Sequence, residues 1–372
     1  MLYVDGSDYS MTVKNKNSTL IYSALNTTRR MPFDAVSGTL PGSRVSIQAS
    51  GTGSVATTAQ DKLDYFVSVT DFGAVGSGLV DDSEAIQKAI DAVVAAGGGV
   101  VWFPMTAGGG DYRVTVTKGV NDKYGIYIPA GGVTLRMENG CRLRRLSPDI
   151  STYALAFPIL LIGVPDDNST QIEGVTLENV KFYGEDTRHT SSGSALMDGR
   201  QAVWVKNTKD FVFDGCRFEN IDSSAIWVQR PAEYDYENTQ YYNTTKCYDC
   251  EIRGSKFSAQ SHATAGRALM HAVQATMDRL QLIGNTFNWC DVGINCSTTY
   301  DDYADTEDDT YTDPNLGLAV KRVGRGYIIQ GNVYYNSSEH CMYLNAMGVS
   351  ATGNVVTVQD PTVCNTTQLQ IR

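Results

Sequence analysis

Apolar side chains recur along the second half of the chain in one repeated arrangement. From about residue 170, the repeat has two apolar residues separated by one position. Gly or Asn follows two positions after the second apolar residue, and an aromatic residue follows three positions after that. The copies end at Phe182, Phe218, Phe257, Phe287, Tyr334 and, in a weaker form, Val356. Because side chains alternate between the two faces of a strand, each copy places one row of apolar side chains in an interior.

The Gly or Asn position of the repeat predicts a positive φ in every copy, since these residues tolerate the left-handed backbone. It is occupied by Asn179, Gly215, Gly254, Gly284, Gly331 and Gly353. Short strands that turn at the same place stack as coils, and each coil buries the core of the next. A sandwich of hairpins is the alternative, but regular hairpin turn chemistry is missing and the motif recurs in register. We therefore expect an all-β solenoid, a parallel β-helix, with loops of unequal length on one side.

One amphipathic helix is predicted ahead of the repeats, between Val69 and Pro104. Its apolar stripe has helical spacing and consists of Ile86, Ala89, Ile90, Val93 and Val94. Side-chain oxygens at Asp81, Asp82 and Ser83 offer partners for the first N–H groups of the helix. Gly97 to Gly99 end it, and a short apolar strand follows at Val100 to Phe103. A helix with one apolar face between two strands must cover a core.

The first 68 residues have a different pattern. Residues 1–55 are polar, with short alternating runs at Ser10–Lys14, Thr19–Tyr22 and Arg44–Ala49 that predict strands of a small β domain. Residues 56–68 contain a short amphipathic segment with Leu63 and Phe66 on one side. A helix this short is marginal alone, so the segment favours association with partner chains.

The stretch from Val69 to Pro104 resembles the opening motif of the pectate-lyase-like superfamily, which includes phage tailspikes and secreted polysaccharide lyases and hydrolases. The matching residues are Asp71, Phe72, Gly73, Ala74, Gly76, Gly78, Asp81, Asp82, Ala85, Ile86, Gln87, Ala89 and Ile90, while Ser77 and Ser83 depart mildly. The resemblance implies a right-handed parallel β-helix over residues 69–372, with the helix as a cap on its open N-terminal end.

Upstream of this motif the resemblance is to phage tailspikes. Residues 1–55 look like the virion-attachment end of podovirus tailspikes. Residues 56–68 resemble a helical neck where three chains meet, with Gln60, Lys62, Leu63, Val67 and Ser68 in matching places. The resemblance implies a homotrimer in the virion tail that contacts other tail or portal-vertex proteins through residues 1–55. Such a protein is assembled in the host cytoplasm and acts at the host cell surface.

Composition narrows the remaining functions. The formal net charge of -11 argues against a general nucleic-acid binder. No apolar run is long enough to cross a bilayer, and the N-terminus lacks the regions of a secretory signal. A chain of 372 residues does not need its eight Cys as a disulfide scaffold. Cys247 and Cys250 form a lone C-x-x-C, and Cys250 takes an inward repeat position, so we expect buried thiols and no metal or cofactor.

After each terminal aromatic residue the chain turns into a further strand. Aligned on the inward residues Ile226, Ile294 and Met342, these strands next hold Trp227, Asn295 and Tyr343. These three side chains should face outward in a line along the coil, and Trp204 is expected to extend the line. Aromatic faces suit the C–H faces of sugar rings, so we expect a carbohydrate-binding row. Packing beneath loops or against a neighbouring chain is the alternative.

Acidic residues come just before the same strands, namely Glu219 and Asp222, then Asp291, then Glu339 beside His340. Glycoside hydrolysis needs one acid that protonates the leaving oxygen and one base or nucleophile. We take Asp222, Asp291 and Glu339 as candidate catalytic carboxylates, and Glu219 and His340 as candidate substrate-binding residues. The rung count places Asp291 and Glu339 one rung apart and Asp222 and Asp291 two rungs apart. The alternative is that each Asp only hydrogen-bonds the backbone of its own turn.

The sequence therefore predicts a phage tailspike that recognises a bacterial surface polysaccharide and depolymerises it, as an endoglycosidase or a lyase. A non-catalytic receptor-binding or adaptor protein of the virion is the first alternative, and a secreted bacterial polysaccharide lyase is the second. The acidic loop from Asp301 to Pro314 lacks EF-hand spacing, so we expect a solvated insertion there and not a Ca²⁺ site.

Overall fold

The computed structural model describes residues 11–14, 20–24, 42–48, 50, 52–116, 124–146, 158–167, 170–184, 201–221, 224–228, 234–235, 240–241, 247–258, 269–275, 277–296, 310–313, 318–321, 324–335, 340–344, 346–357 and 369–371. The chain divides into two compact units, residues 1–63 and 64–372. In the described part of the chain, no helix is long and apolar enough to span a membrane.

The first unit contains two small antiparallel pairs. Strands β1 (Met11–Lys14) and β2 (Leu20–Ala24) form one pair, and β3 (Ser46–Ile47) and β4 (Thr57–Thr58) form the other, with the 3-10 turn η1 (Gly42–Arg44) before β3. The helix α1 (Ala59–Tyr65) begins directly after β4. Its start is fixed by Thr58 and Asp61, because each side chain accepts a hydrogen bond from the other residue's backbone N–H. Leu63 on this helix is 60% exposed.

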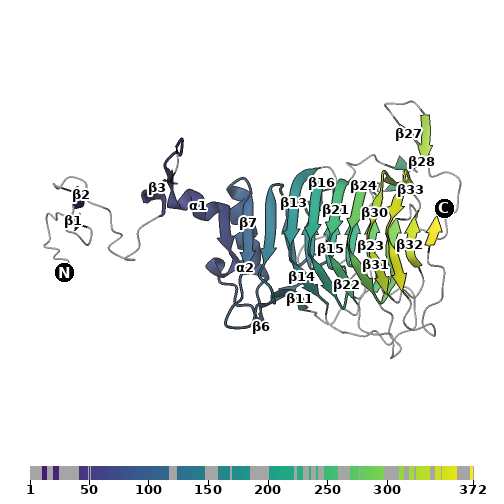
Figure 1. Cartoon of the computed structure of the whole chain (residues 1–372), viewed down its shortest axis with the longest axis horizontal. Helices are drawn as coiled ribbons and strands as arrows, with labels where there is room; N and C mark the ends of the chain where they lie inside the picture. The colour runs from purple at the N-terminus through teal and green to yellow at the C-terminus, as the bar shows by residue number, and fades with distance from the viewer. Residues whose placement is uncertain are drawn as a thin grey trace. The chain divides into compact units, whose positions relative to one another are not determined.

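The second unit is a coil of three parallel sheets (Figure 1). The first sheet runs through β5 (Phe66–Ser68), β7 (Gly99–Phe103), β10 (Val133–Met137), β13 (Ile172–Glu178), β16 (Thr208–Asp214), β21 (Tyr248–Arg253), β24 (Asp278–Ile283), β29 (Gly324–Arg325) and β33 (Ala346–Met347). In the same sheet, β30 (Ile328–Gln330) also pairs with β24, and β34 (Ser350–Thr352) pairs with β30.

The second sheet runs through β6 (Ser77–Asp81), β8 (Asp111–Thr115), β11 (Arg142–Leu146), β14 (Lys181–Tyr183), β17 (Arg217–Glu219), β22 (Lys256–Ser258), β25 (Thr286–Asn288), β31 (Val333–Tyr335) and β35 (Val355–Thr357). The third sheet runs through β9 (Ile126–Ile128), β12 (Leu160–Ile162), β15 (Val203–Val205), β18 (Ile226–Val228), β23 (Leu269–Ala275), β26 (Cys290–Cys296), β32 (His340–Leu344) and β36 (Leu369–Ile371). The chain visits the sheets in turn and pairs each strand with its counterpart in the next coil, so the predicted parallel β-helix is confirmed.

Insertions leave the coil at two places with short antiparallel pairs of their own. Strands β19 (Tyr234–Asp235) and β20 (Gln240–Tyr241) form one pair, and β27 (Thr310–Asp313) and β28 (Leu318–Lys321) form the other. The end of the predicted acidic insertion thus lies in β27, and its residues 301–309 fall outside the described part.

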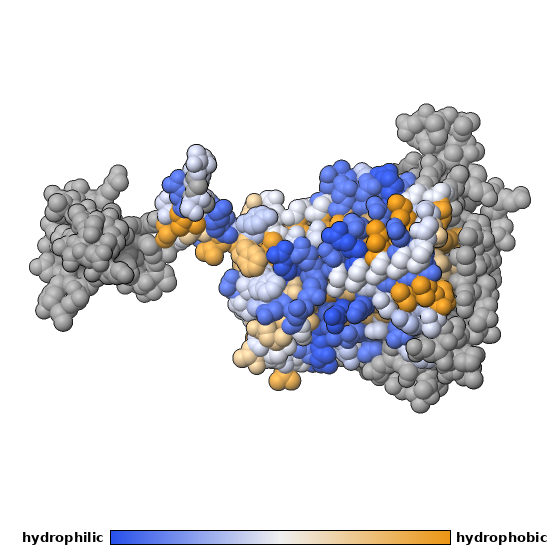
Figure 2. All heavy atoms as spheres, viewed as in Figure 1, coloured by the Kyte–Doolittle hydropathy of each residue, from blue (hydrophilic) through white to orange (hydrophobic). Residues whose placement is uncertain are grey.

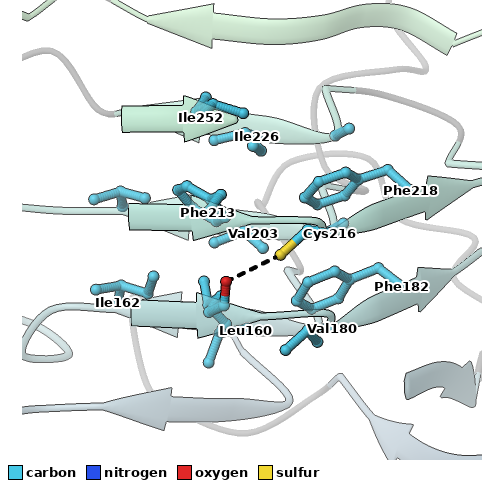
Figure 3. Close-up of a cluster of buried hydrophobic side chains, with 14 of the residues drawn as sticks. Leu160, Ile162, Val180, Phe182, Val203, Phe213, Cys216, Phe218, Ile226 and Ile252 are labelled. Carbon is cyan, nitrogen blue, oxygen red and sulfur yellow. Dashed lines mark hydrogen bonds between the residues drawn. The ribbon is translucent and has the colours of Figure 1, made fainter. Parts of the chain in front are cut away.

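The terminal aromatic residues of the repeat stack in the interior. Neighbouring rings in the series Phe182, Phe218, Phe257, Phe287 and Tyr334 have centroids 4.8–5.2 Å apart and interplanar angles of 4–7°. Figure 3 shows Phe182 and Phe218 of the second sheet one above the other, beside aliphatic side chains of the first and third sheets such as Ile252 and Val203. All five rings are fully buried, so this stack is a continuous core that links successive coils.

The predicted positive φ occurs in every copy of the repeat, from 55° at Asn179 to 65° at Gly331. In the last three copies the residue after this bend is an asparagine, and these side chains form hydrogen bonds with each other between successive coils. Asn285 Nδ2 donates to Asn332 Oδ1 (3.0 Å), and Asn332 Nδ2 donates to Asn354 Oδ1 (3.0 Å). The same nitrogens also donate to main-chain oxygens, which satisfies amides that are fully buried at Asn285 and Asn332.

The helix α2 (Ser83–Ala95) lies across the start of the coil and contacts β5, β7, β8 and β9, which belong to all three sheets. Ile86, Ala89, Ile90 and Val93 are fully buried, as the apolar stripe predicts. One detail differs from the sequence prediction. The Asp82 side chain forms no capping bond and instead accepts the N–H groups of Val75 and Gly76, because the glycine-rich loop folds back over the helix start.

The cysteines that the structure describes are buried, reduced thiols, as the repeat positions predict. They are Cys141, Cys216, Cys247, Cys250, Cys290 and Cys341. Burial raises the pKa of Cys247 to about 12, and its sulfur accepts the N–H of Thr208. The thiol of Cys216, by contrast, donates a hydrogen bond to the carbonyl oxygen of Leu177 (dashed line in Figure 3). These groups are core side chains, which explains the lone C-x-x-C motif without a ligand.

Candidate functional site

The outer face of the third sheet carries one line of residues in strict register, which we call the outer row. Its members are Tyr127, Leu161, Trp204, Trp227, Gln274, Asn295 and Tyr343, one from each of seven successive strands. The register agrees with the predicted alignment of Trp227, Asn295 and Tyr343 behind inward apolar residues. The predicted line was incomplete, because Gln274 lies between Trp227 and Asn295.

Trp204 occupies its predicted place in the line but is not exposed, which corrects the sequence expectation. Only 6% of it reaches solvent. Its ring stacks on Trp227 with centroids 5.1 Å apart and planes 15° apart, and the ammonium of Lys206 lies 5.3 Å from the same ring. With both neighbours in place, Trp204 supports Trp227 and offers no open face of its own to a sugar.

The section of the outer row from Trp227 to Tyr343 is half-buried and chemically mixed. An aromatic ring lies at each end, and two carboxamides, those of Gln274 and Asn295, lie between them. Ser224 donates its hydroxyl to Gln274 Oε1 (2.7 Å), which fixes the orientation of that amide. Successive strands are about 4.8 Å apart, so an extended ligand along the coil axis would meet a new side chain at every rung.

Two further donors lie buried in and just after β15, the strand before this section. Among the residues that the structure describes, the indole Nε1 of Trp204 and the Nδ2 of Asn207 have no hydrogen-bond partner. Lys206, which lies between them in the chain, is 2% exposed. Sequence patterns gave no sign of these donors, because their burial depends on the loops around them and not on strand alternation. A group that accepts hydrogen bonds would satisfy the indole Nε1 of Trp204 and the Nδ2 of Asn207.

The candidate acids are placed unequally by the structure. Asp222 and Glu339 lie outside the described residues. Asp291 lies inside β26 and not in a turn, because that strand begins at Cys290 and pairs along most of its length with β23. The strand order β18, β23, β26, β32 agrees with the rung count made from the repeat. The catalytic roles of all three stay predictions.

The other candidate residues separate onto two sheets. His340 opens β32 on the third sheet, opposite Val292. Glu219 ends β17 on the second sheet, where its carboxylate pairs with Lys181 Nζ at 2.7 Å. The structure therefore does not bring Glu219 into the outer row, because the chain turns between β17 and β18.

Charges on the outer face of the first sheet are matched between coils. Ion pairs join Arg136 to Glu178 and Lys209 to Glu173, and further pairs join Arg253 to Asp214 (2.8 Å) and Arg279 to Asp249 (2.7 Å). Arg279 lowers the pKa of Asp249 through these hydrogen bonds. Figure 2 shows hydrophilic side chains over much of the coil in that view. Since opposite charges meet at four successive steps from β10 to β24, we interpret this face as a structural surface.

Comparison with known proteins supports the opening motif. Residues 66–131 match the family described as rhamnogalacturonase A/epimerase, pectate lyase-like. The matched segment contains α2 and the first coil of the β-helix, as the resemblance of the Val69–Pro104 stretch predicts.

Individual relatives align over limited stretches of the chain. The chain is 43% identical over 76 residues to mannuronan C5-epimerase AlgE4 of Azotobacter vinelandii, which covers 19% of this chain and 13% of the relative. It is 44% identical over 70 residues to alginate lyase 7 of the same organism, which covers 18% of this chain and 8% of the relative. Among solved structures, a tailspike protein of the E. coli bacteriophage HK620 aligns over 86% of this chain and 55% of its own, with 16% identity and a TM-score of 0.49.

Proposed function

We propose that this chain is a phage tailspike that recognises a bacterial surface polysaccharide and cleaves it along the outer row. The observation that carries the proposal is the in-register series Trp227, Gln274, Asn295 and Tyr343 on four successive strands. Rings for stacking and amides for hydrogen bonds, repeated along one axis, suit a linear chain of sugars. Two relatives that match part of this chain are named for enzymes of mannuronan and alginate, which also supports a polysaccharide substrate.

The chemistry proposed is cleavage by two carboxylates among Asp222, Asp291 and Glu339. Strands one rung apart are separated by about 4.8 Å, and strands two rungs apart by about twice that. Retaining glycosidases hold their carboxyl groups about 5–5.5 Å apart, and inverting ones about 6.5–9.5 Å apart. The pair Asp291 and Glu339 would fit the first geometry, and the pair Asp222 and Asp291 the second.

The test replaces each acid with its amide, as Asp222→Asn, Asp291→Asn and Glu339→Gln, and measures reducing ends released from purified bacterial capsule and exopolysaccharides. Loss of a general acid or base is expected to slow release by about 10²–10⁴-fold. Asp214→Asn, on the first sheet, is the matched control and should keep full activity. Undiminished activity in all three variants would contradict the catalytic assignment.

The products also separate the remaining alternatives. A lyase would leave an unsaturated sugar end that absorbs in the ultraviolet, whereas a hydrolase would not. Tight binding with no oligosaccharide released from any polymer would instead favour a non-catalytic attachment protein of the virion.

We further propose that the chain is a homotrimer with a virion-attachment domain at residues 1–55, a neck at 56–68 and the β-helix at 69–372. Apolar side chains lie exposed at the start of the coil, namely Tyr65, Phe66, Phe72, Val75, Leu79 and Val80, with Leu79 83% exposed. Exposed apolar patches on soluble proteins usually mark contact surfaces. Sedimentation should give three times the chain mass, and Phe66→Ser with Leu79→Ser should lower it. A monomeric mass for the unaltered chain would contradict the trimer.

A further inference from the structure

Four basic residues line up on the outer face of the second sheet, and we call them the basic row. They are Arg142, Lys181, Arg217 and Lys256, on β11, β14, β17 and β22. Lys181, Arg217 and Lys256 pair directly in register. Arg142 and Lys181 directly precede the paired residues Leu143 and Phe182, so they share the same position.

Two of the four cations are already engaged within the fold. Arg142 pairs with Asp111 at 2.6 Å, and Lys181 pairs with Glu219 at 2.7 Å. Arg217 and Lys256 are exposed, and neither forms an ion pair with any residue that the structure describes. Half of the basic row therefore presents its charge to solvent.

A second group of cations flanks the start of the row. Arg113 and Arg144 pair in register on β8 and β11, and Tyr183 follows Arg144 on β14. The guanidinium carbons of Arg142 and Arg144 lie 4.8 and 5.3 Å from the Tyr183 ring centroid. The same two groups pair with Asp111 Oδ2 at 2.6 and 3.3 Å, so the Tyr183 ring and this carboxylate together fix their positions within the fold.

Comparison with the first sheet shows that the coil can form without a row of like charges on its surface. There, four ion pairs join opposite charges on neighbouring coils between β10 and β24. On the second sheet, Lys181, Arg217 and Lys256 repeat one sign over three neighbouring strands. Like charges in directly opposed positions destabilise a sheet, so this arrangement costs folding stability and calls for a compensating role.

We infer that the basic row is a secondary binding site for an acidic polysaccharide, whose chain lies along the coil axis. Successive rungs lie about 4.8 Å apart, whereas double-stranded DNA carries one charge per about 1.7 Å of its axis. The charge spacing of a polysaccharide with one carboxylate on each sugar is closer to the rung distance. The net charge of -11 also opposes the long-range attraction on which nucleic-acid binding depends. The choice of a polysaccharide as the ligand rests on the proposed function, but the basic row lies on a different sheet from the outer row.

The test uses the full chain and immobilised polygalacturonate at low salt, with neutral dextran as the uncharged comparison. The variant Arg217→Gln with Lys256→Gln removes two exposed cations without breaking any ion pair of the described residues. Each exposed charge contact contributes little, so the pair should weaken binding about tenfold at low salt, and the difference should shrink as salt screens it. Dextran should not bind the basic row at all.

The matched control is Lys62→Gln with Lys88→Gln, which makes the same change in net charge at exposed positions on α1 and α2. It should bind within about twofold of the unaltered chain, since distant charges are screened. Equal affinity of the two double variants for polygalacturonate would overturn the inference. Binding of a single-stranded oligothymidylate as tightly as polygalacturonate would overturn the assignment to polysaccharide. If Trp227→Ala alone weakens polymer binding, the proposed function stands and the secondary site fails.

Discussion

The indole rings of Trp204 and Trp227 stack across two coils, with centroids 5.1 Å apart and planes 15° apart. Trp204 is almost fully buried between this partner and Lys206, whereas Trp227 remains half-buried. One ring thus anchors the other in a fixed orientation. Trp227 therefore has a defined face beside Gln274, where the polar section of the outer row begins.

Replacing Trp227 with Ala should weaken oligosaccharide binding without unfolding the coil. An aromatic contact adds about 0.5–1.5 kcal/mol beyond area burial, so the dissociation constant should rise by up to about tenfold. Titration calorimetry measures the change. Trp102→Ala is the matched control, since Trp102 is half-buried on the first sheet, and its effect on binding should be negligible. Equal losses in both variants would show that Trp227 acts only through stability.

The buried amide row makes Asn332 a strong candidate for a stability defect. Its Oδ1 accepts the backbone N–H of Asn285, and its Nδ2 donates to the carbonyl oxygen of Leu282. Asn332→Ala leaves these buried groups unpaired, at about 1–3 kcal/mol for each. Urea unfolding should show a loss of at least about 3 kcal/mol. Asn288→Ala, at a half-buried position on the second sheet, should change stability by less than about 0.5 kcal/mol.

Gly254 tests the backbone requirement of the repeat. Its φ is 57°, and an added Cβ would meet no atom within 4 Å, so strain of the backbone is the only penalty. Gly254→Ala should cost about 1–2 kcal/mol in unfolding free energy. Gly254→Asn should cost less, because Asn179 already occupies the same place in another coil with a φ of 55°. An Asn variant less stable than the Ala variant would contradict this explanation.

The repeat could be predicted from the sequence because the local preferences of its residues favour the same backbone that the coil requires. Period-2 apolar pairs, a positive φ and a stacked ring all act within one rung, so each copy carries its own evidence. Gln274 was missed since the stretch before it has no such signature, although Val273 pairs with Ile226 in register. The burial of Trp204 and the early start of β26 at Cys290 depend on neighbouring coils, which strand alternation does not report.

The ion pair between Asp249 and Arg279 gives a test of pH dependence. Hydrogen bonds from Arg279 lower the pKa of Asp249, so the charged carboxylate stabilises the fold at neutral pH. That contribution is complete above the ordinary pKa of an aspartate and is lost as the pH falls through the lower folded value. Asp249→Asn keeps a residue suited to the local φ of 58° and removes only the charge.

The expected loss at pH 7 is at most about 1 kcal/mol, because the pair is exposed, and it should vanish in acid. Denaturant unfolding at pH 7 and at pH values below the aspartate range measures it. Asp210→Asn is the control, since Asp210 holds the same place one coil earlier with a φ of 52° and has no ion pair within the described part. A loss that persists in acid would mean that the charge is not its cause.

The most direct measurement for the whole account is a crystal structure of the protein with an oligosaccharide of its polymer bound. The account predicts sugar rings along the outer row, with one ring against Trp227 and hydrogen bonds to the amides of Gln274 and Asn295. An oligosaccharide bound elsewhere, with these side chains untouched, would contradict it.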